Sequence, residues 1–271
     1  MTRSVGKITV VRRVVQGCML VLFCLPPMLA GWGLAGLFVG GDGEVATPAE
    51  GVFFGSLSSS SVAGVPLFDP LGALEVTVAS RSLLAASALT GALLVVVVYG
   101  LVRGRAFCGW VCPVNLIGEA VDAARRRLGI KVPERTVPRR AKIGVAVAVV
   151  LLSALVGFPV FELISPIGAV NKGLVFGGLA GAGTLLAIVI AELLVSRRLW
   201  CRALCPLGGT FQVLGCAGQV NVAIDHDACI HCDKCTHVCL ADPVILAPAL
   251  AGEDAIVRAG DCMACGACVD V

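Results

Sequence analysis

Charged side chains are scarce in this chain: Asp, Glu, Lys and Arg make up 14% of its 271 residues, whereas a soluble globular domain carries about 25%. Histidine is scarcer still, and all three histidines lie in the last fifth of the sequence. No Cys-x-x-Cys-His motif is present, because Cys229-Ile-His-Cys232 is followed by Asp233. These absences exclude a covalently attached c-type haem, and they leave no paired histidines in the rest of the chain to bind another haem.

Hydrophobic residues, in contrast, make up 58% of the sequence, and the mean hydropathy is +0.94. Four long stretches hold at most one charged residue each, namely residues 14–41, 82–102, 143–161 and 173–195. Each has the roughly 20 residues that an α-helix needs to cross the hydrocarbon core of a bilayer. We therefore expect a mainly α-helical membrane domain over residues 14–205, built as a bundle of four transmembrane helices.

The few charged residues are distributed unevenly between the apolar stretches. Residues 1–13 and 103–142 are rich in Lys and Arg, whereas residues 42–80 hold five acids and no base. Loops with an excess of Lys and Arg are cytoplasmic, so the pattern predicts a multi-pass protein of the bacterial cytoplasmic (inner) membrane, with both termini in the cytoplasm. The basic run of residues 103–142 is then expected to face anionic lipid, and it requires no nucleic acid as a partner.

The cysteines of residues 217–271 have a regular spacing. They read Cys229-Ile-His-Cys232-Asp-Lys-Cys235-Thr-His-Val-Cys239 and Cys262-Met-Ala-Cys265-Gly-Ala-Cys268. The spacing C-x2-C-x2-C-x3-C is typical of bacterial ferredoxins with two [4Fe–4S] clusters, in which the fourth cysteine of one run binds the other cluster. We therefore expect a small α+β ferredoxin-like domain. One cluster is predicted at Cys262, Cys265, Cys268 and Cys239, and the other at Cys229, Cys232 and Cys235.

The second of these clusters lacks a fourth thiolate, because its ligand is due at position 272 and the sequence stops at Val271. We expect that the sequence is truncated, since a ferredoxin fold normally has a strand after its last cysteine. A [3Fe–4S] cluster is the alternative. Zinc is a further alternative, but zinc sites usually pair two C-x2-C knuckles across a longer gap.

The apolar part of the chain contains an internal repeat. Arg103-Gly-Arg-Ala-Phe-Cys108-Gly-Trp-Val-Cys112-Pro113 follows the second apolar stretch, and Arg197-Arg-Leu-Trp-Cys201-Arg-Ala-Leu-Cys205-Pro206 follows the fourth. Two pseudo-repeated helical hairpins would bring these four cysteines together, and four thiolates can bind a cluster or a thiophilic metal. We therefore expect an additional redox or metal site at Cys108, Cys112, Cys201 and Cys205. The alternative is two buried or redox-active dithiol pairs.

Several of these motifs together resemble the NapH family of ferredoxin-type proteins. The resemblance rests on Arg12-Arg13, Pro66-Leu-Phe-Asp-Pro-Leu71, Phe107-Cys-Gly-Trp-Val-Cys-Pro-Val-Asn115 and Asp261-Cys-Met-Ala-Cys-Gly-Ala-Cys-Val-Asp-Val271. It implies an iron–sulfur subunit that takes electrons from the membrane quinol pool and passes them toward a periplasmic nitrate reductase. Its implied partners are a NapG-like periplasmic ferredoxin and a c-type cytochrome.

A quinol substrate gives the acidic residues a possible role, because quinol oxidation releases two protons together with two electrons. Four acids lie at the edge of an apolar stretch or in the acidic segment, namely Glu162, Glu192, Asp69 and Glu75. Of these, Glu162 and Asp69 are the candidates for accepting the protons. Hydrated carboxylates without a function are the simpler interpretation of each. Cys18, Cys24 and Cys216 lack a ligand spacing, and we expect them to be packing residues.

Two other functions share this architecture. One is MauN-like electron transfer in methylamine oxidation, and the other is a CcoG-like metal reductase or maturation factor; the C-terminal region of NosR is also similar. A copper-handling protein would be expected to carry Met or His in the acidic segment. Residues 42–81 contain neither, so the sequence favours the quinol dehydrogenase over the maturation factor.

Overall fold

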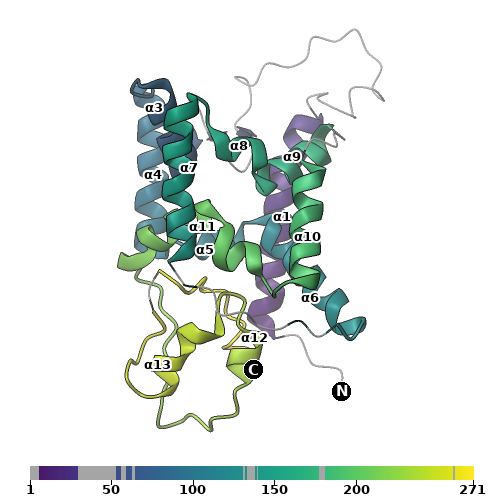
Figure 1. The fold of residues 1–271 in the computed structure, drawn as a ribbon. Helices are drawn as coiled ribbons and strands as arrows, with labels where there is room; N and C mark the ends of the chain where they lie inside the picture. Colours follow the sequence, from purple (N-terminus) through teal and green to yellow (C-terminus); the bar gives the residue numbers. More distant parts are fainter. Residues whose placement is uncertain are drawn as a thin grey trace.

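The computed structural model describes residues 6–29, 53–55, 59–62, 65–130, 132, 138, 140–176, 181–258 and 260–271. The chain is mainly helical, and its long helices form two groups (Figure 1). The first group comprises α3 (Pro70–Ser80), α4 (Ala86–Val102) and α7 (Ala141–Val156). The second comprises α1 (Lys7–Leu29), α9 (Pro166–Phe176) and α10 (Ala182–Leu194).

Shorter elements connect the two groups. They are α5 (Ala106–Trp110), α6 (Pro113–Arg127), α8 (Val160–Ile164), the π-helical turn η2 (Trp200–Leu204), α11 (Pro206–Leu214) and the 3-10 turn η3 (Gly215–Ala217). A three-stranded antiparallel sheet has the order β1 (Phe53–Gly55), β2 (Ser59–Val62), β3 (Val65–Phe68). In its register Ser60 lies opposite Leu67, and β3 packs on α4.

The repeat in the sequence corresponds to an exchange of helices between the two groups. α4 is followed by α5 and then by α6, which packs against α9 and α10 of the other group. In the same way, α10 is followed by η2 and then by α11, which packs against α7 and α4. Each exchanged helix begins with proline at its first position, where the missing amide hydrogen costs nothing. The two C-x3-C-P segments therefore lie where the chain passes between the groups.

The prediction of four transmembrane helices is wrong. Among the residues that the structure describes, no helix combines the length and the apolar composition needed to cross a bilayer. At about 1.5 Å per residue, the 17 residues of α4, the 16 of α7 and the 13 of α10 fall short of the roughly 30 Å of hydrocarbon. α1 is longer but carries Lys7, Arg12 and Arg13. The predicted multi-pass location in the bacterial cytoplasmic membrane, with both termini in the cytoplasm, is overturned by the same finding.

The predicted spans are interrupted where the backbone turns. α7 ends at Gly157, whose φ of 74° is a left-handed conformation that favours glycine, so residues 143–161 are shared between α7 and α8. The fourth stretch, residues 173–195, contains the end of α9 and the whole of α10, which begins after Gly181 at φ 88°. Residues 30–41 of the first predicted span lie outside the described part of the chain.

The cysteine-rich tail forms a small unit at one end of the helices (Figure 1). It contains α12 (Lys234–Val238), the 3-10 turn η4 (Pro243–Leu246) and α13 (Ala247–Leu250). Two chain segments pair through one antiparallel bridge between Ala223 and Ile256. Asp270, near the end of the chain, caps the start of α1, because its carboxylate accepts hydrogen bonds from the amides of Ile8 (3.2 Å) and Thr9 (2.7 Å).

Buried ion pairs hold α1, α6 and the start of η2 together. Arg12 is 1% exposed and pairs with Glu119, while Arg198 Nε donates to Asp122 at 2.9 Å. Burial by itself would raise the pKa of Glu119, but the hydrogen bond and the charge of Arg12 outweigh burial and lower it. Since a buried charge without its partner costs several kcal/mol, about 3–5, these pairs fix the positions of the three elements relative to one another.

Two glycines of α4 provide a test of this packing. A Cβ atom at Gly91 would lie 1.6 Å from the carbonyl oxygen of Pro66 in β3, whereas one at Gly100 would meet only an ordinary contact at 3.8 Å. We expect Gly91→Ala to destabilise the protein by about 1–3 kcal/mol through overpacking. Gly100→Ala should stabilise it by about 0.5–1 kcal/mol, because alanine favours helix. Thermal unfolding of both variants distinguishes them, and equal melting temperatures would contradict the packing of β3 on α4.

Candidate functional site

The four cysteines of the C-x3-C-P motifs lie at the two crossings between the helix groups. Cys108 belongs to α5 and Cys201 to η2, while Cys112 and Cys205 are the N-cap residues of α6 and α11. Burial raises the pKa of the Cys112 thiol well above its ordinary value, and the charges of the other three cysteines raise it further. Four sulfurs that affect one another in this way share one site, so the structure brings together the residues that the repeat predicted.

Three buried cations surround these sulfurs. Lys142 is 3% exposed; burial and the charge of Arg105 lower its pKa to about 8, while Cys108 and Cys205 act in the opposite direction. Arg105 is 2% exposed and Arg198 is 1% exposed. Arg105 lowers the pKa of Cys205, and Arg198 lowers that of Cys201, although burial raises both thiol pKa values overall. Buried thiolates are thus offset by nearby positive charge, as a set of cluster ligands requires.

The tail brings four more cysteines together around one cavity: Cys239, Cys262, Cys265 and Cys268. Burial raises the pKa of Cys239 to about 12, and the charges of Cys265 and Cys262 add to this effect. Cys239 comes from the first cysteine run and the others from the second. The fold therefore produces the crossed arrangement in which the fourth cysteine of one run joins the other three.

The two cysteine loops of the tail have the same backbone pattern. Both residues that flank the middle cysteine of each loop have positive φ: His231 (50°) and Asp233 (53°) around Cys232, and Ala264 (48°) and Gly266 (70°) around Cys265. Alternation between right- and left-handed conformations turns successive amide hydrogens inward, which forms the anion-binding nests found at iron–sulfur sites. The donor set and the backbone of both loops thus fit such a cluster.

The first loop is more open than the second. Cys235 packs against the hydrophobic core of the tail, and its charge reaches Cys268 of the other set. Cys229 is half-buried and Cys232 is exposed.

Among the described residues, no three Cys, His, Asp or Glu side chains are arranged to hold a single metal ion.

Two buried arginines join the tail to the helices. Arg103, which is fully buried, donates to the carbonyl oxygens of Val220 (2.6 Å) and Val257 (2.9 Å). Arg105 donates to the carbonyl oxygens of Asp261 (2.5 Å) and Cys201 (3.2 Å). Arg105 therefore bridges the second cysteine loop and one C-x3-C-P segment directly.

Trp110 adds a third connection between α5 and the tail. Its indole Nε1 donates to the carbonyl oxygen of Ala264 at 2.9 Å, inside the second cysteine loop. Its neighbour Gly109 allows this loop to approach, because a Cβ atom there would lie 2.8 Å from the carbonyl oxygen of Met263. Cys108 and Cys201 pack against the same core as Cys262 and Cys265, so the two cysteine sets are neighbours.

The buried cations near the cysteines and the tail, Arg103, Arg105, Lys142 and Arg198, were not identified as site residues from the sequence. The basic run of residues 103–142 was expected to face lipid, but Arg103, Arg105 and Lys142 are buried inside the protein. A usable signal was their position, since Arg103-Gly-Arg105 and Arg197-Arg198 precede the cysteines of the two repeats. Of the cysteines expected to be packing residues, Cys24 is buried, whereas Cys18 and Cys216 are exposed. Cys24 Sγ lies 3.5 Å from Asn171 Oδ1, and Cys216 Sγ lies 3.5 Å from the Gln212 carbonyl oxygen.

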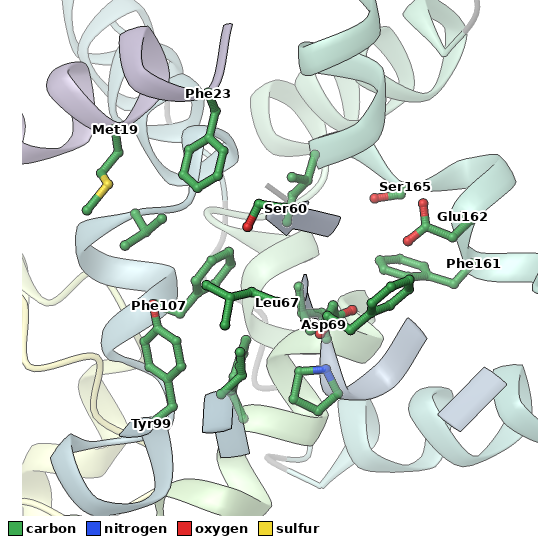
Figure 2. A pocket seen from close by; sticks show the side chains of 17 residues that line it. Met19, Phe23, Ser60, Leu67, Asp69, Tyr99, Phe107, Phe161, Glu162 and Ser165 are labelled. Carbon is green, nitrogen blue, oxygen red and sulfur yellow. The ribbon is translucent and has the colours of Figure 1, made fainter. Parts of the chain in front are cut away.

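A cavity of about 150 Å³ (Figure 2) is lined by Phe107, Phe161 and Phe211, which belong to the same buried cluster as Cys112. Both predicted proton acceptors, Asp69 and Glu162, line it beside Phe161, while Tyr99 and Phe107 form another part of its wall. Burial, opposed by hydrogen bonds from two amides, raises the pKa of Asp69 to about 7. Burial and the charge of Glu75 raise the pKa of Glu162. The cavity is thus apolar on one side and acidic on the other.

The aromatic wall of this cavity continues to the cysteines. The rings of Phe107 and Phe211 lie 5.2 Å apart, and that of Tyr99 lies 5.8 Å from Phe107. Phe107, Phe211 and Cys112 belong to one buried cluster, against which Cys108 and Cys205 pack. The cavity therefore adjoins the buried cluster against which three of the four cysteines lie.

The attachment of the tail depends on the guanidinium group of Arg103. We expect Arg103→Lys to keep the charge but to lose most of the hydrogen bonds to the tail, each of which leaves a buried acceptor unpaired at about 1–3 kcal/mol. Hydrogen exchange at residues 220–224 and 255–258 should accelerate, and the melting temperature should fall. Arg126→Lys, at an exposed position of α6, is the matched control. Unchanged exchange in Arg103→Lys would contradict the role given to this residue.

Comparison with known proteins agrees with these sites. Residues 84–131 and 177–219, which include all four C-x3-C-P cysteines, match a family described as a 4Fe-4S binding domain. Residues 221–271 match a 4Fe-4S dicluster domain. No solved structure matches the chain.

Two groups of curated proteins are similar over most of the chain. The ferredoxin-type protein NapH of Escherichia coli is 40% identical over 223 residues, which cover 81% of this chain and 77% of that protein. NapH of Haemophilus influenzae is 34% identical, with 82% and 77% covered. The methylamine utilization ferredoxin-type protein MauN of Methylorubrum extorquens is 36% identical, with 80% and 76% covered. Two iron–sulfur domains and these likenesses identify an electron-transfer protein, and the chain belongs to the NapH family of ferredoxin-type proteins.

Proposed function

We propose that the protein oxidises a quinol in the cavity of Figure 2 and transfers its electrons to iron–sulfur clusters. The observation that carries this proposal is the order of the three sites. The cavity wall contains Phe107 and Phe211, which share a buried cluster with Cys112. Cys108 packs against that cluster and also against the core that holds Cys262 and Cys265. A substrate in the cavity, the four cysteines and the tail would thus form a continuous series.

The cysteines are assigned to three iron–sulfur sites in this proposal. Cys239, Cys262, Cys265 and Cys268 hold one [4Fe–4S] cluster, and Cys229, Cys232 and Cys235 hold a second. The C-x3-C-P cysteines hold an additional centre. This last assignment is supported by the shared burial of its four thiols and by the cations Arg105, Lys142 and Arg198. Clusters of this kind accept and release electrons over a wide range of potentials, set by net charge, hydrogen bonds and solvent exposure.

The chemistry of the cavity suits a quinol. A cavity of about 150 Å³ with apolar walls accepts one six-membered ring. Quinol oxidation yields a quinone, two electrons and two protons, so the site needs two groups that can take a proton. Asp69 and Glu162 supply two carboxylates on the same side of the cavity. Asp69, with a pKa raised to about 7, is suited to accept a proton near neutral pH.

We propose further that the electrons continue through partner proteins to a periplasmic nitrate reductase. The likeness to NapH, at 40% identity, supports this acceptor. The likeness to MauN, a methylamine utilization protein, supports a second candidate in which the protein serves methylamine oxidation. Expression during growth on nitrate, or on methylamine, would separate the two.

The test of the quinol function is electron paramagnetic resonance of the anaerobically purified full-length protein, before and after addition of a benzoquinol without an isoprenoid tail. Cluster signals that develop with the quinol would support the proposal. Clusters that are not reduced by the quinol but are reduced by a strong low-potential reductant would favour a metal reductase or maturation factor. Iron on the same sample should be about 12 per chain for three [4Fe–4S] clusters, or about eight for two.

Serine substitutions test the ligand assignments. We expect Cys265→Ser and Cys239→Ser to lose the same cluster, because both residues line one cavity. Cys108→Ser and Cys201→Ser should have equal effects on iron content and on quinol-dependent reduction. Cys18→Ser, at an exposed position of α1, is the control that should keep all of its iron. A full iron content in Cys239→Ser would overturn the crossed arrangement of the tail.

The pH dependence tests the role of Asp69. A protonated carboxyl cannot accept a proton, so the rate of quinol oxidation should rise as the pH increases through about 7, the pKa of Asp69. Asp69→Asn should lower the rate by about 10²–10⁴-fold and remove this step from the profile. Stopped-flow reduction at pH 5.5–8.5 measures both quantities. A profile that keeps its step in Asp69→Asn would assign the titration to another group.

A further inference from the structure

Behind the cavity lies a third carboxylate, Glu75 of α3, which is fully buried. Its Oε1 accepts hydrogen bonds from the Ser153 hydroxyl at 2.8 Å and from the Phe161 amide at 3.2 Å. The Ser153 oxygen is itself an acceptor for the Val160 amide at 3.1 Å, so the hydroxyl hydrogen is directed to Glu75. Glu75 Oε2 is buried and has no hydrogen-bond partner in the described part of the protein.

This carboxylate faces the two acids of the cavity. The charge of Glu75 raises the pKa of both Asp69 and Glu162, and for Glu162 it is the largest charge effect. Phe161, whose amide binds Glu75, is the residue before Glu162. Asp69, Gly72 and Glu75 follow one another at intervals of three, so they lie along one face of α3. Glu75 is therefore the innermost member of an acidic series that begins at the cavity.

Gly72 keeps the space between these acids open. A Cβ atom at Gly72 would stand 3.7 Å from Asp69 Oδ2 and 3.7 Å from Glu162 Oε1. This is an ordinary van der Waals distance, so an alanine would fit there without displacing its neighbours. The glycine is not required by its backbone, since α3 is helical at this position. Its effect is to leave room between the carboxyl groups.

A buried carboxyl oxygen without a donor is costly, about 1–3 kcal/mol or more, and nothing in the packing of α3 requires one. No positively charged neighbour among the described residues offsets the cost of leaving Glu75 Oε2 unpaired. From α8 and the α3 N-cap it faces the acids Glu162 and Asp69, and the cation that affects Glu162 is Lys172 of α9. On α7, Lys142 is 11 residues from Ser153, about 16 Å along the helix. The free oxygen is thus placed as a proton acceptor.

We propose that Glu75 receives a proton from Glu162 during quinol oxidation and thereby restores Glu162 for the next turnover. The inference rests on the proposed quinol function. The quinol loses two electrons to the clusters and two protons, one to Asp69 and one to Glu162. The O–H bond on Glu162 then breaks as an O–H bond forms at Glu75 Oε2, directly or through one water in the space beside Gly72. After the quinone has left, the proton of Asp69 leaves through the emptied cavity, and the proton of the fully buried Glu75 leaves the same way by passing back through Glu162.

The test uses Glu75→Gln in the full-length protein with its clusters. The amide oxygen can still accept from Ser153 and Phe161, but the amide nitrogen cannot take a proton. We expect kcat for the tail-free benzoquinol to fall at least tenfold with KM unchanged, and the pH profile to shift. Glu253→Gln makes the same chemical change at an exposed position of the tail, so it is the matched control and should keep the wild-type rate and pH profile.

Gly72→Ala provides an independent variant, should Glu75→Gln fail to fold. This variant should retain its iron and its melting temperature, but its rate of quinol oxidation should fall. The reason is that the methyl group fills the space beside Asp69 Oδ2 and Glu162 Oε1. Wild-type kinetics and pH profile in both Glu75→Gln and Gly72→Ala would overturn the inference while leaving the quinol function intact. Clusters of the wild-type protein that are not reduced by the quinol would overturn both the quinol function and the role of Glu75.

Discussion

The attachment of the cysteine-rich tail by buried arginines is the interaction on which the arrangement of the three sites depends. Arg103 and Arg105 reach from the turn between α4 and α5 to carbonyl oxygens in both paired segments of the tail and in its second cysteine loop. A guanidinium group presents five donors in a fixed plane, so it can bind several carbonyls whose positions are set by different parts of the chain. Together with the Trp110 hydrogen bond and the shared hydrophobic core, these contacts hold Cys108 and Cys201 beside Cys262 and Cys265.

Burial and charge act together at the cysteines. Buried thiols resist ionisation, and burial raises the pKa of Cys205 and Cys239 to about 12. Cluster ligands must nevertheless be thiolates. Around the C-x3-C-P cysteines the protein supplies Arg105, Lys142 and Arg198. Around the tail cysteines it supplies inward-facing backbone amides. If both sets of cysteines bind clusters as proposed, the two kinds of site would favour thiolates by different means.

The cavity is surrounded by acids, whereas the C-x3-C-P cysteines have buried cations nearby. Here burial raises the pKa of both Asp69 and Glu162, and the charge of Glu75 raises both pKa values further. In the proposed function, protons would move along the acids next to α3. Electrons would pass toward the cysteines on the side of the cavity where Phe107 and Phe211 lie.

The sequence by itself determined the chemistry of the sites. Cysteine spacing named every tail residue that the structure gathers, including Cys239, because ligand spacing follows from local backbone geometry. The repeat named Cys108, Cys112, Cys201 and Cys205, and Asp69 and Glu162 were selected as carboxylates at the edges of apolar stretches. The mainly helical fold also followed from composition.

Only the tertiary structure decided what these residues contact. Hydropathy counts apolar residues but does not record where a helix stops, so α7, α9 and α10 were merged with their turns into spans that do not exist. Charge counts placed Arg103, Arg105 and Lys142 in an exposed loop, although long-range partners bury them. Glu75 was considered with Asp69, Glu162 and Glu192 but was not selected as a site residue, because its contacts are with Ser153 and Phe161, 78 and 86 residues away. Side-chain roles that depend on partners so distant in sequence are fixed by packing, which a local pattern does not contain.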